Sequence, residues 1–410
     1  MYDNVLTVGS ALYAVSAFVS LFLSGLLFRD LADVSQWVVQ TARHTTMRVW
    51  YHRHAIAIAS LLSFATSIGL LWYNQDTVSI WLGLSASLLF LLFFYSGYIN
   101  PHIMMRARMK NGVFVSVEQA KKHYSDQESV IVIDIDGEAR AHSDRQMLRP
   151  HVAGNGQSMG GEEVVMTYCG LTNLGIAYTP EIDGQAVDLA PMNQLENNLV
   201  MYDKVTGEPI QQIWGSKEAD VNACACAPRM KEHPTFRMPF AKFAQAYPEG
   251  QVFLNDYLIK EMRPSFWKNP FLAIYDPIMD LLFKSANVYQ AKSDKPVFPT
   301  IEVKDTRLAS KTLIWGVNVE NDYVAYTEQF VREHNGIINT TVGGKAVVVA
   351  YDEHFQSLGI FYNHSGADID TIDFWGNTLH GKLSRVESVK AGAYWMVWAN
   401  FFPETDLNRG

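Results

Sequence analysis

Three long runs without a charged residue constrain this fold more than any other feature of the chain. They cover residues 7–28, 55–73 and 78–98. Each run approaches the length of about 20 residues that crosses a hydrocarbon core about 30 Å thick. None has the polar stripe that a helix on the surface of a globular domain carries. The sequence therefore predicts a transmembrane anchor of three helices within residues 1–105, in contact with the lipid bilayer.

The distribution of lysine and arginine indicates which side of the membrane the rest of the chain occupies. Basic residues lie in the loop between the first two runs and again after the third run, at Arg29, Arg43, Arg48, Arg53, Arg106, Arg108 and Lys110. Segments rich in Lys and Arg stay in the cytoplasm, so this rule predicts a cytoplasmic soluble domain. The spans hold no ionisable residue that would mark a transport pathway. They are typical of an anchor, or of a surface for other membrane subunits or a second copy of the chain.

Composition excludes several functional classes. The net charge is −9 and no basic stripe is present, which argues against nucleic acid as a partner. Three cysteines among 410 residues cannot form a disulfide framework. The sequence has no Gly-rich phosphate loop, dinucleotide fingerprint or HExxH zinc motif.

An internal repeat organises the part of the chain that follows the anchor. GGEEVVMTYC at 160–169 matches GGKAVVVAYD at 343–352, and LGIAY matches LGIFY further on. A histidine, His151 or His334, stands nine residues before each Gly pair. Each stretch later has a Trp-Gly pair and closes with an aromatic-Ala-x-x-aromatic-Pro-Glu run, at Trp214-Gly215, Trp375-Gly376, 243–249 and 398–404. Such self-similarity predicts two copies of one unit.

The predicted fold class is α+β, with a mainly β soluble region of two similar tandem units behind three transmembrane helices. Runs such as VIVIDI, EVVMTYC, LGIAY, LVMY and IQQIW predict strands, and MPFAKFAQAY and AYWMVWANFF predict one helix near the end of each unit. The copies cover about 125–255 and 305–408. We name the domains that contain them half one, residues 106–260, and half two, residues 305–410. The linker, 261–304, is too apolar for a free tether, and either packs between the halves or rests on the membrane surface.

The motifs of half one resemble a known family. GGEEVVMTYCGLTNLGIAY, NNLVMYDKVTGEPIQQIWG and FAQAYPEG are similar to the domain of unknown function 3179 family, whose pattern is GG-x-x-VVVTYC-x-x-CGT followed by MYD-x-x-TG. The resemblance covers nearly all of 125–410. It implies a bacterial or archaeal protein without an established function, and hence a bacterial inner (plasma) membrane. Some relatives are selenoproteins, which implies redox chemistry at the motif cysteines. Many are exported, which implies the alternative of a periplasmic domain.

The cysteines are the strongest candidates for chemistry. Cys169, Cys224 and Cys226 all lie in half one, and half two has Asp352 in place of Cys169. The sequence therefore predicts that half two is the structural copy. Three thiolates suit Cu(I), or Zn(II) with a fourth ligand from His151, His233 or water. The predicted metal ligands are thus Cys169, Cys224, Cys226 and His151, with copper or zinc as the cofactor.

Three other interpretations remain open at this point. In the first, Cys169 is a catalytic nucleophile whose mixed disulfide Cys224 or Cys226 resolves. Thr172 replaces the second motif cysteine, so a Cys-x-x-Cys pair is excluded. In the second, the cysteines are small buried hydrophobic residues. In the third, the chain is a non-enzymatic interaction protein or accessory subunit of a larger membrane complex. The sequence does not decide whether the protein is an enzyme.

Overall fold

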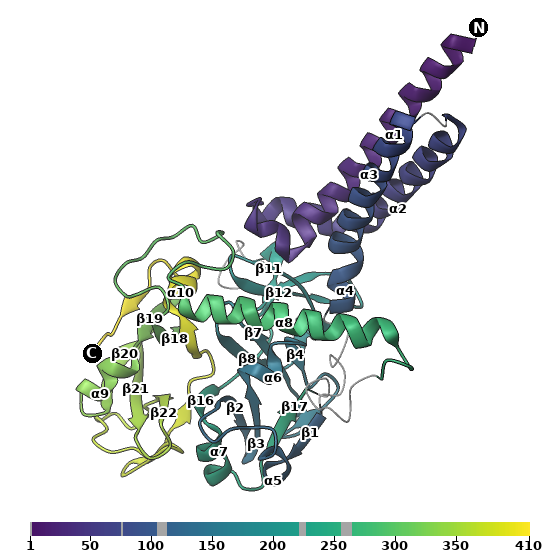
Figure 1. Cartoon of the computed structure of the whole chain (residues 1–410). Coiled ribbons are helices and arrows are strands. Elements are labelled where there is room, and N and C mark those ends of the chain that lie inside the picture. The colour runs from purple at the N-terminus through teal and green to yellow at the C-terminus, as the bar shows by residue number, and fades with distance from the viewer. Residues whose placement is uncertain (1, 75–76, 105–112, 221–226, 256–264) are drawn as a thin grey trace. The chain divides into compact units, whose positions relative to one another are not determined.

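The computed structural model describes residues 2–74, 77–104, 113–220, 227–255 and 265–410. Its contacts divide the chain into two compact units. The first consists of Met1–Met104 with Met192–Leu195, and the second of Met105–Pro191 with Glu196–Gly410. Figure 1 shows the first unit as helices and the second as the part that holds the sheets.

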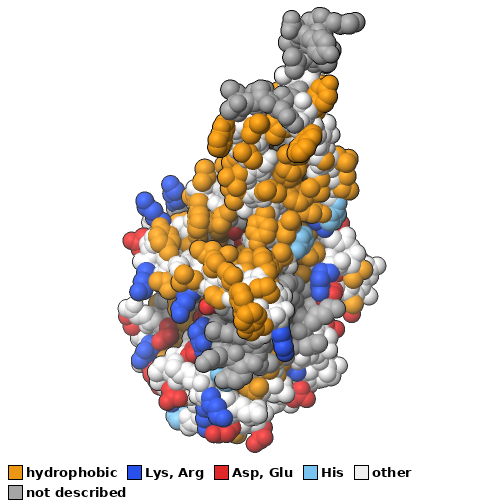
Figure 2. Space-filling model, turned by 45° about the vertical axis from the view of Figure 1, so that its right-hand side comes forward, with side chains coloured by type: hydrophobic (Ala, Val, Ile, Leu, Met, Phe, Trp, Pro, Cys, Tyr) orange, Lys and Arg blue, Asp and Glu red, His pale blue; other side chains and the backbone are white. Residues whose placement is uncertain are grey.

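The first unit is a helical hairpin bundle. Its elements are α1 (Tyr2–Leu31), η1 (Asp33–Trp37), α2 (Arg43–Asn74), α3 (Thr77–Phe94), the π-helical η2 (Tyr95–Ile99) and α4 (Asn100–Met104). Three helical stretches are long and apolar enough to span a membrane, namely Gly9–Leu31, Arg43–Tyr73 and Ile80–Met104. Figure 2 shows hydrophobic side chains covering the faces of these helices. The protein is therefore membrane-associated, and the prediction of three spanning helices is confirmed.

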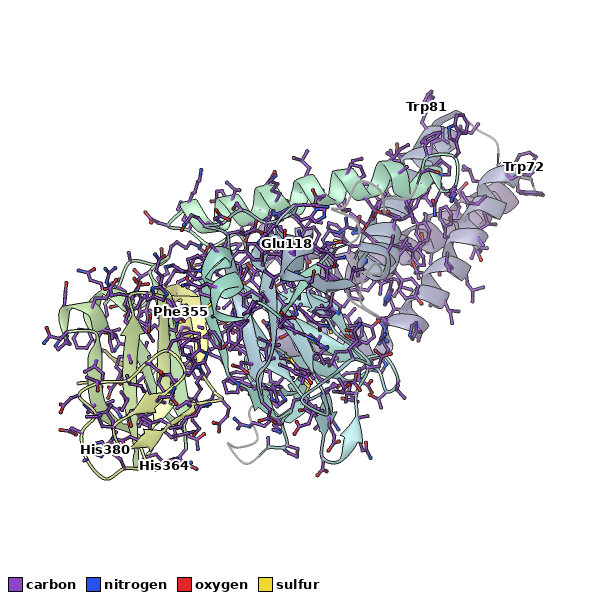
Figure 3. The ribbon with its side chains drawn as sticks, turned by 90° about the horizontal axis from the view of Figure 1, so that it is seen from below. Trp72, Trp81, Glu118, Phe355, His364 and His380 are labelled. Atoms are coloured by element: carbon purple, nitrogen blue, oxygen red, sulfur yellow. The ribbon has the colours of Figure 1, made fainter. Side chains whose placement is uncertain are left out.

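Small residues let the helices of this unit approach closely. A Cβ atom on Gly97 of η2 would overlap the backbone of Leu27 in α1. The Ser60 hydroxyl of α2 donates to the Ser20 carbonyl of α1 over 3.2 Å. Glycine and serine at helix contacts are typical of packing inside a bilayer, where hydrophobicity does not drive helices together. Trp72, near the end of α2, and Trp81, near the start of α3, are exposed (Figure 3). Exposed tryptophans near the ends of spanning helices are typical of the membrane interface.

Half one contains three main sheets, with short helices between some of their strands. The first sheet has the order β1-β17-β3-β2-β16, from Val113–Ser116, Gln251–Leu254, Glu138–Ser143, Ser129–Ile135 and Thr235–Pro239. The second has the order β15-β8-β7-β4, from Glu232–His233, Leu174–Tyr178, Val165–Cys169 and Val152–Ala153. A third sheet, β11-β12-β13-β14, comes from Leu189–Leu195, Asn198–Asp203, Pro209–Gln211 and Ser216–Lys217. The short helices are α5 (Val117–Ala120), α6 (Asp144–Met147), η3 (Glu218–Asp220) and α7 (Phe240–Ala246).

Two small hairpins complete half one, and the observed strands refine the sequence prediction. The hairpins pair β5 (Ser158–Met159) with β6 (Glu162–Glu163) and β9 (Glu181–Ile182) with β10 (Gln185–Ala186). Four of the five strand runs named above form strands at the expected places. The fifth, IQQIW, is a strand only as far as Gln211, because the Gly215 amide turns back to donate to the Gln211 carbonyl over 2.9 Å.

Half two has two four-stranded sheets. The first has the order β26-β18-β19-β27, from Lys390–Tyr394, Leu313–Val319, Asp322–Tyr326 and Asp406–Leu407. The second has the order β20-β21-β22-β25, from Ile337–Val342, Lys345–Asp352, Ser357–Tyr362 and Ser384–Arg385. The remaining elements are α9 (Glu328–Glu333), the hairpin β23 (Asn377–Thr378) with β24 (Gly381–Lys382), and α10 (Trp395–Phe401).

The strand orders of the two halves correspond. In each half the first hairpin pairs antiparallel with a late strand, β16 or β26, and parallel with the last strand, β17 or β27. The Gly160 and Gly343 turns have φ of 59° and 57°. After each Trp-Gly pair the glycine carbonyl accepts a backbone bond, from Met230 at Gly215 and from Leu383 at Gly376. This agreement supports the predicted repeat, while superposition of the halves stays a prediction.

The linker contains one long helix, α8 (Pro270–Lys292), and it belongs to the second unit. The Asn269 side chain caps its first turn by accepting from the Leu272 amide over 3.0 Å. Figure 1 shows α8 crossing beside β4, β7 and β8. Gln290 of α8 is buried and donates to the Leu171 carbonyl over 2.5 Å. The helix therefore covers the turn that follows Cys169.

Candidate functional site

Cys169 ends β7 at the start of the turn to β8. Its side chain is 0% exposed. Asn173 closes the turn with φ of 58°, a left-handed conformation that asparagine tolerates better than most residues. The strand predicted over EVVMTYC is therefore observed, with Cys169 as its last residue.

Several hydrogen-bond donors surround the sulfur. Thr172 Oγ1 lies 3.5 Å from Cys169 Sγ. The backbone amides of Leu171, Thr172 and Leu199 also hydrogen-bond to the sulfur. The thiol itself donates to the Asn197 carbonyl over 3.7 Å. The donors favour the thiolate, but complete burial outweighs them and raises the pKa of Cys169 above its ordinary value.

A buried polar network holds the side chain next to the sulfur. Asn198 Nδ2 donates to Thr172 Oγ1 over 2.9 Å and to Gln212 Oε1 over 3.2 Å. Gln212 Nε2 donates to Thr167 Oγ1 over 3.2 Å. All four residues are fully buried. Because an unmade bond in such a network is costly, Thr172 has one well-defined place beside Cys169.

The other two cysteines, Cys224 and Cys226, lie outside the described residues. The chain on both sides of them is described. It enters from η3 and resumes before Met230, whose amide donates to the Gly215 carbonyl over 2.9 Å. Met230 is buried in the same core cluster as Cys169. The described chain that follows the two cysteines thus reaches the core cluster of Cys169 at Met230, and the distance of both sulfurs from that of Cys169 stays a prediction.

His151 is a buried neutral histidine. It is 2% exposed, and burial lowers its pKa to about 4. The ring packs edge-on against Phe283 of α8 at a centroid distance of 5.7 Å. Its backbone carbonyl accepts from the Tyr168 amide over 2.7 Å. A neutral imidazole one strand away from Cys169 keeps the chemical form of a metal ligand.

The strand register separates His151 from His334. Val152 pairs with Thr167 in half one, and Ile337 pairs with Ala350 in half two. His151 therefore corresponds to Gly336, since each directly precedes the paired strand. The nine-residue spacing of both histidines from a Gly pair does not make them structural equivalents.

His233 is engaged in a different part of half one. Its Nε2 lies 2.8 Å from Thr179 Oγ1 and 3.7 Å from Glu162 Oε2. Across the described ranges, no three His, Cys, Asp or Glu side chains are close enough together to hold a metal ion. The predicted ligand set of Cys169, Cys224, Cys226 and His151 therefore stays a prediction, since two of its members lie outside the described residues.

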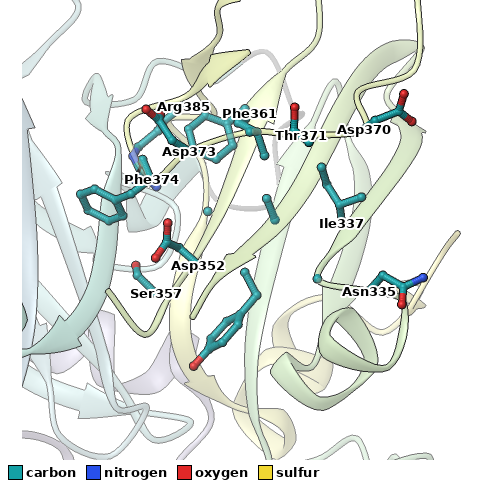
Figure 4. A pocket seen from close by; sticks show the side chains of 15 residues that line it. Asn335, Ile337, Asp352, Ser357, Phe361, Asp370, Thr371, Asp373, Phe374 and Arg385 are labelled. Carbon is teal, nitrogen blue, oxygen red and sulfur yellow. Dashed lines mark hydrogen bonds between the residues drawn. The ribbon is translucent and has the colours of Figure 1, made fainter. Parts of the chain in front are cut away.

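Half two has an open polar pocket at the place that Cys169 occupies in half one. Cys169 pairs with Leu174, and Asp352 pairs with Ser357 at the same ladder position. The pocket has a volume of about 240 Å³ and is lined by polar groups that include Asp352, Ser357, Asp370, Asp373 and Arg385 (Figure 4). The Ser357 hydroxyl is buried and has no hydrogen-bond partner within the described part of the chain. The prediction that half two is the structural copy did not take this cavity into account, and it stays a prediction.

Arg385 forms one wall of this pocket. Its guanidinium carbon lies 4.2 Å from the ring centre of Phe236, 4.7 Å from that of Phe361 and 4.9 Å from that of Phe374. Nη2 donates to the Phe374 carbonyl over 2.6 Å. Burial lowers the pKa of Arg385 to about 10, and it stays charged at neutral pH. Because Phe236 belongs to half one, this stack joins the halves.

Comparison with known proteins gives a family but no described function. A family model described as "Protein of unknown function (DUF3179)" matches residues 101–405. This chain belongs to the DUF3179 family. No curated protein and no solved structure matches it. The DUF3179 region includes both halves and the linker, and it starts inside the third candidate span.

Position 172 is where this DUF3179 domain departs from the motif that we described for the family. Thr172 Oγ1 touches the Cys169 sulfur at 3.5 Å, so the side chains at 169 and 172 are in direct contact. The threonine hydroxyl donates to the Asn197 carbonyl over 2.7 Å and cannot supply a second thiol.

Sequence reasoning did not find Arg385 or the carboxylates around it in this DUF3179 domain. The one available signal was Asp352 at the place of Cys169. Arg385 lies on β25, a strand of two residues with no motif of its own. Its role depends on three phenylalanines that are far apart in sequence, so no local pattern identifies it.

Proposed function

We propose that this protein is a membrane-anchored metal-binding protein that holds copper(I) or zinc(II) through Cys169, Cys224 and Cys226. The observation that supports it is the set of donors around the Cys169 sulfur. Three backbone amides donate to this sulfur and favour a thiolate, whereas its burial favours the neutral thiol. A soft cation at the sulfur would supply the positive charge that keeps the thiolate deprotonated.

The remaining ligands follow from the same part of the chain. Cys224 and Cys226 form a Cys-x-Cys pair in the sequence, and Met230, four residues further on, is buried in the core cluster of Cys169. His151 is the proposed fourth ligand for zinc. Burial lowers its pKa to about 4, so the ring already has the neutral form that coordinates metal at pH 7.

Thiol-redox chemistry is the second form of this proposal. Cys169 would attack as a thiolate, and Cys224 or Cys226 would resolve the mixed disulfide. The raised pKa and full burial of Cys169 lower the thiolate fraction and the access that a nucleophile needs. We therefore favour metal binding over redox catalysis.

The competing class is a non-enzymatic accessory subunit. The spanning helices would then dock to other membrane subunits, or to a second copy of the chain. We propose the inner membrane of a bacterium as the location, with the soluble domain on the cytoplasmic face because basic residues flank it. The periplasmic face is the alternative. Reporter fusions after Gly112 that are active only outside the cytoplasm would reverse the assignment.

Metal analysis of the full chain in detergent tests the proposal. We expect about one ion per wild-type chain after loading with Zn(II) or Cu(I). Cys169→Ser and the double variant Cys224→Ser/Cys226→Ser should each lose it. Asp352→Ser, at the equivalent place in half two, is the matched control and should keep the ion. A wild-type chain without bound metal, or a Cys169→Ser variant with full metal, would overturn the proposal.

A further inference from the structure

Helix α8 packs on its own domain with a polar face. Asp276 is buried and pairs with the buried Arg149 at 3.0 Å. Further along, Gln290 donates to the Leu171 carbonyl and accepts from the Val297 amide over 2.7 Å. Asp276, Phe283 and Gln290 follow one another at intervals of seven residues, so they lie on one face of the helix. The ring of Phe283 contacts that of His151. The inner face is thus fixed by specific bonds.

The opposite face of α8 is apolar and exposed. We name it the outer stripe, and its six residues recur at helical spacing, each between 46% and 64% exposed: Phe271, Ile274, Ile278, Leu281, Leu282 and Val288. Trp267, just before the helix, is 91% exposed. A soluble domain normally turns such a stripe inward. Here the arrangement is reversed, which indicates an apolar environment outside the domain.

The covalent chain fixes which environment is near. The third candidate span ends at Met104, and the described part of the second unit starts at Val113. Nine residue steps reach at most about 30 Å when fully extended. The domain that carries α8 therefore cannot leave the neighbourhood of the bilayer. The bilayer that holds the spans is therefore an apolar environment within reach of α8 in every copy of the protein.

Charge fits the same partner. Lys268, Lys284 and Lys292 are exposed along or beside α8, whereas its most buried acid, Asp276, is already paired with Arg149. Lys284 and Lys292 border a shallow groove of about 530 Å³ that Leu281, Val288 and Tyr289 also line. Lysines beside an apolar stripe suit anionic head groups above acyl chains.

We propose that α8 is an interfacial helix that lies in the plane of the bilayer, with the outer stripe among the acyl chains. Its acids and lysines are unlike the composition of the three spanning helices. Through Gln290 and Phe283 the same helix covers the turn after Cys169, so membrane contact and the cysteine site share one element. The inference rests on the spans and the tether, and not on the proposed metal.

Photolabelling from within the bilayer tests this inference. The full chain is reconstituted in nanodiscs of phosphatidylcholine and phosphatidylglycerol that include a lipid with a diazirine in its acyl chain. Labelled peptides are then mapped by mass spectrometry. We expect label on the outer stripe as well as on the three spans, and none on helix α9 of half two.

Two variants make the test specific. Ile278→Asp/Leu281→Asp should lower labelling of α8 about tenfold, because both side chains leave the acyl region. Leu379→Asp, at a residue 90% exposed in half two, should leave it unchanged. Labelled spans with an unlabelled α8 would overturn the inference. A second outcome would also overturn the inference: the wild-type chain is a dimer with α8 unlabelled, and the double variant is a monomer. A second copy of the chain, and not lipid, would then cover the outer stripe.

Discussion

The ends of β7 and β21 occupy the same place in two corresponding sheets and have opposite surroundings. At the end of β7, Cys169 is fully buried in a core that includes Trp395 and Trp398 of half two. At the end of β21, Asp352 faces an open pocket of about 240 Å³. A thiol tolerates burial, whereas a carboxylate needs water or partners. The residue type at each strand end therefore fits its surroundings, a thiol in the closed core and a carboxylate at the open pocket.

Both ends also contact the other half in a reciprocal way. The turn after Cys169 binds β26, since the Tyr394 amide donates to the Thr172 carbonyl over 2.9 Å. The turn after Asp352 places His354 Nε2 2.9 Å from Gln245 of α7. Phe355, labelled in Figure 3, joins the core cluster of half one. A change at either end is therefore expected to affect the packing between the halves.

Exchanging the two residues should give the largest difference. Cys169→Asp buries a carboxylate, and we expect it to lower the free energy of unfolding by about 3–5 kcal/mol. Asp352→Cys removes one bond, from the Phe355 amide to Oδ1 at 2.7 Å, and should cost about 1 kcal/mol. Thermal and denaturant unfolding of the full chain in detergent measure both. Equal losses would mean that the two strand ends do not differ in burial.

Lowering the pH should lower the stability of half one more than that of half two. His151 has an ordinary pKa of 6.5 and a folded pKa of about 4, lowered by burial. Between these values the unfolded chain binds more protons, so stability falls as the pH falls through this window. The loss is about 1.4 kcal/mol per pH unit. Half two has only exposed histidines, such as His364 and His380 (Figure 3).

The unfolding midpoint at pH 7 and pH 5 checks this expectation. His151→Asn keeps a residue that tolerates the φ of 67° and removes the titrating ring, so it should flatten the pH dependence. His364→Asn is the control and should leave it as in the wild type. A pH dependence that survives in His151→Asn would assign it to other groups, such as the buried His142.

Removing the Arg385 guanidinium from the pocket at the end of β21 should lower the free energy of unfolding by an intermediate amount. Arg385→Met keeps the length of the side chain but loses the stack on three phenylalanines and the bond to the Phe374 carbonyl. We expect a loss of about 2 kcal/mol in the free energy of unfolding. Arg332→Met removes exposed ion pairs and should leave the unfolding midpoint unchanged. If the two variants behave alike, Arg385 does not join the halves.

The features that could be predicted from the sequence are those that a short continuous stretch of residues determines. The spans were predictable because about 20 apolar residues in a row have few other interpretations. The strand at 165–169 and the helix at 240–246 were predictable from short patterns. The family was identifiable because each of its motifs is a short continuous run of residues, the first of which contains Cys169.

Features that depend on distant contacts were not predictable. His151 and His334 are not at equivalent places because half one has two more residues between Val152 and Gly160 than half two has between Ile337 and Gly343. The equal spacing of the histidines from the Gly pairs does not reveal this difference. The polar inner face of α8 depends on Arg149, more than a hundred residues away. The linker's apolar composition indicated contact with another surface, but the sequence did not say which face of the helix was apolar.

The two Gly-Gly turns offer the smallest and most closely matched comparison. Gly160 and Gly343 have nearly the same φ, 59° and 57°, and each amide donates to a carboxylate, of Glu138 or Asp322. Alanine at either place is therefore strained by about 1 kcal/mol. At Gly160 the new Cβ would overlap the side chain of Ile135, which can rotate away.

At Gly343 the new Cβ would instead overlap the backbone carbonyl of Val319, which is held within β18. We therefore expect Gly343→Ala to lower the free energy of unfolding by about 1 kcal/mol more than Gly160→Ala. Gly344→Ala, where an added Cβ meets open space at φ of 73°, isolates the cost of the backbone conformation. Denaturant unfolding of the three variants measures the difference. If Gly160→Ala were the costlier change, the first turn would be the tighter one, and the two turns would not share the packing that a common repeat implies.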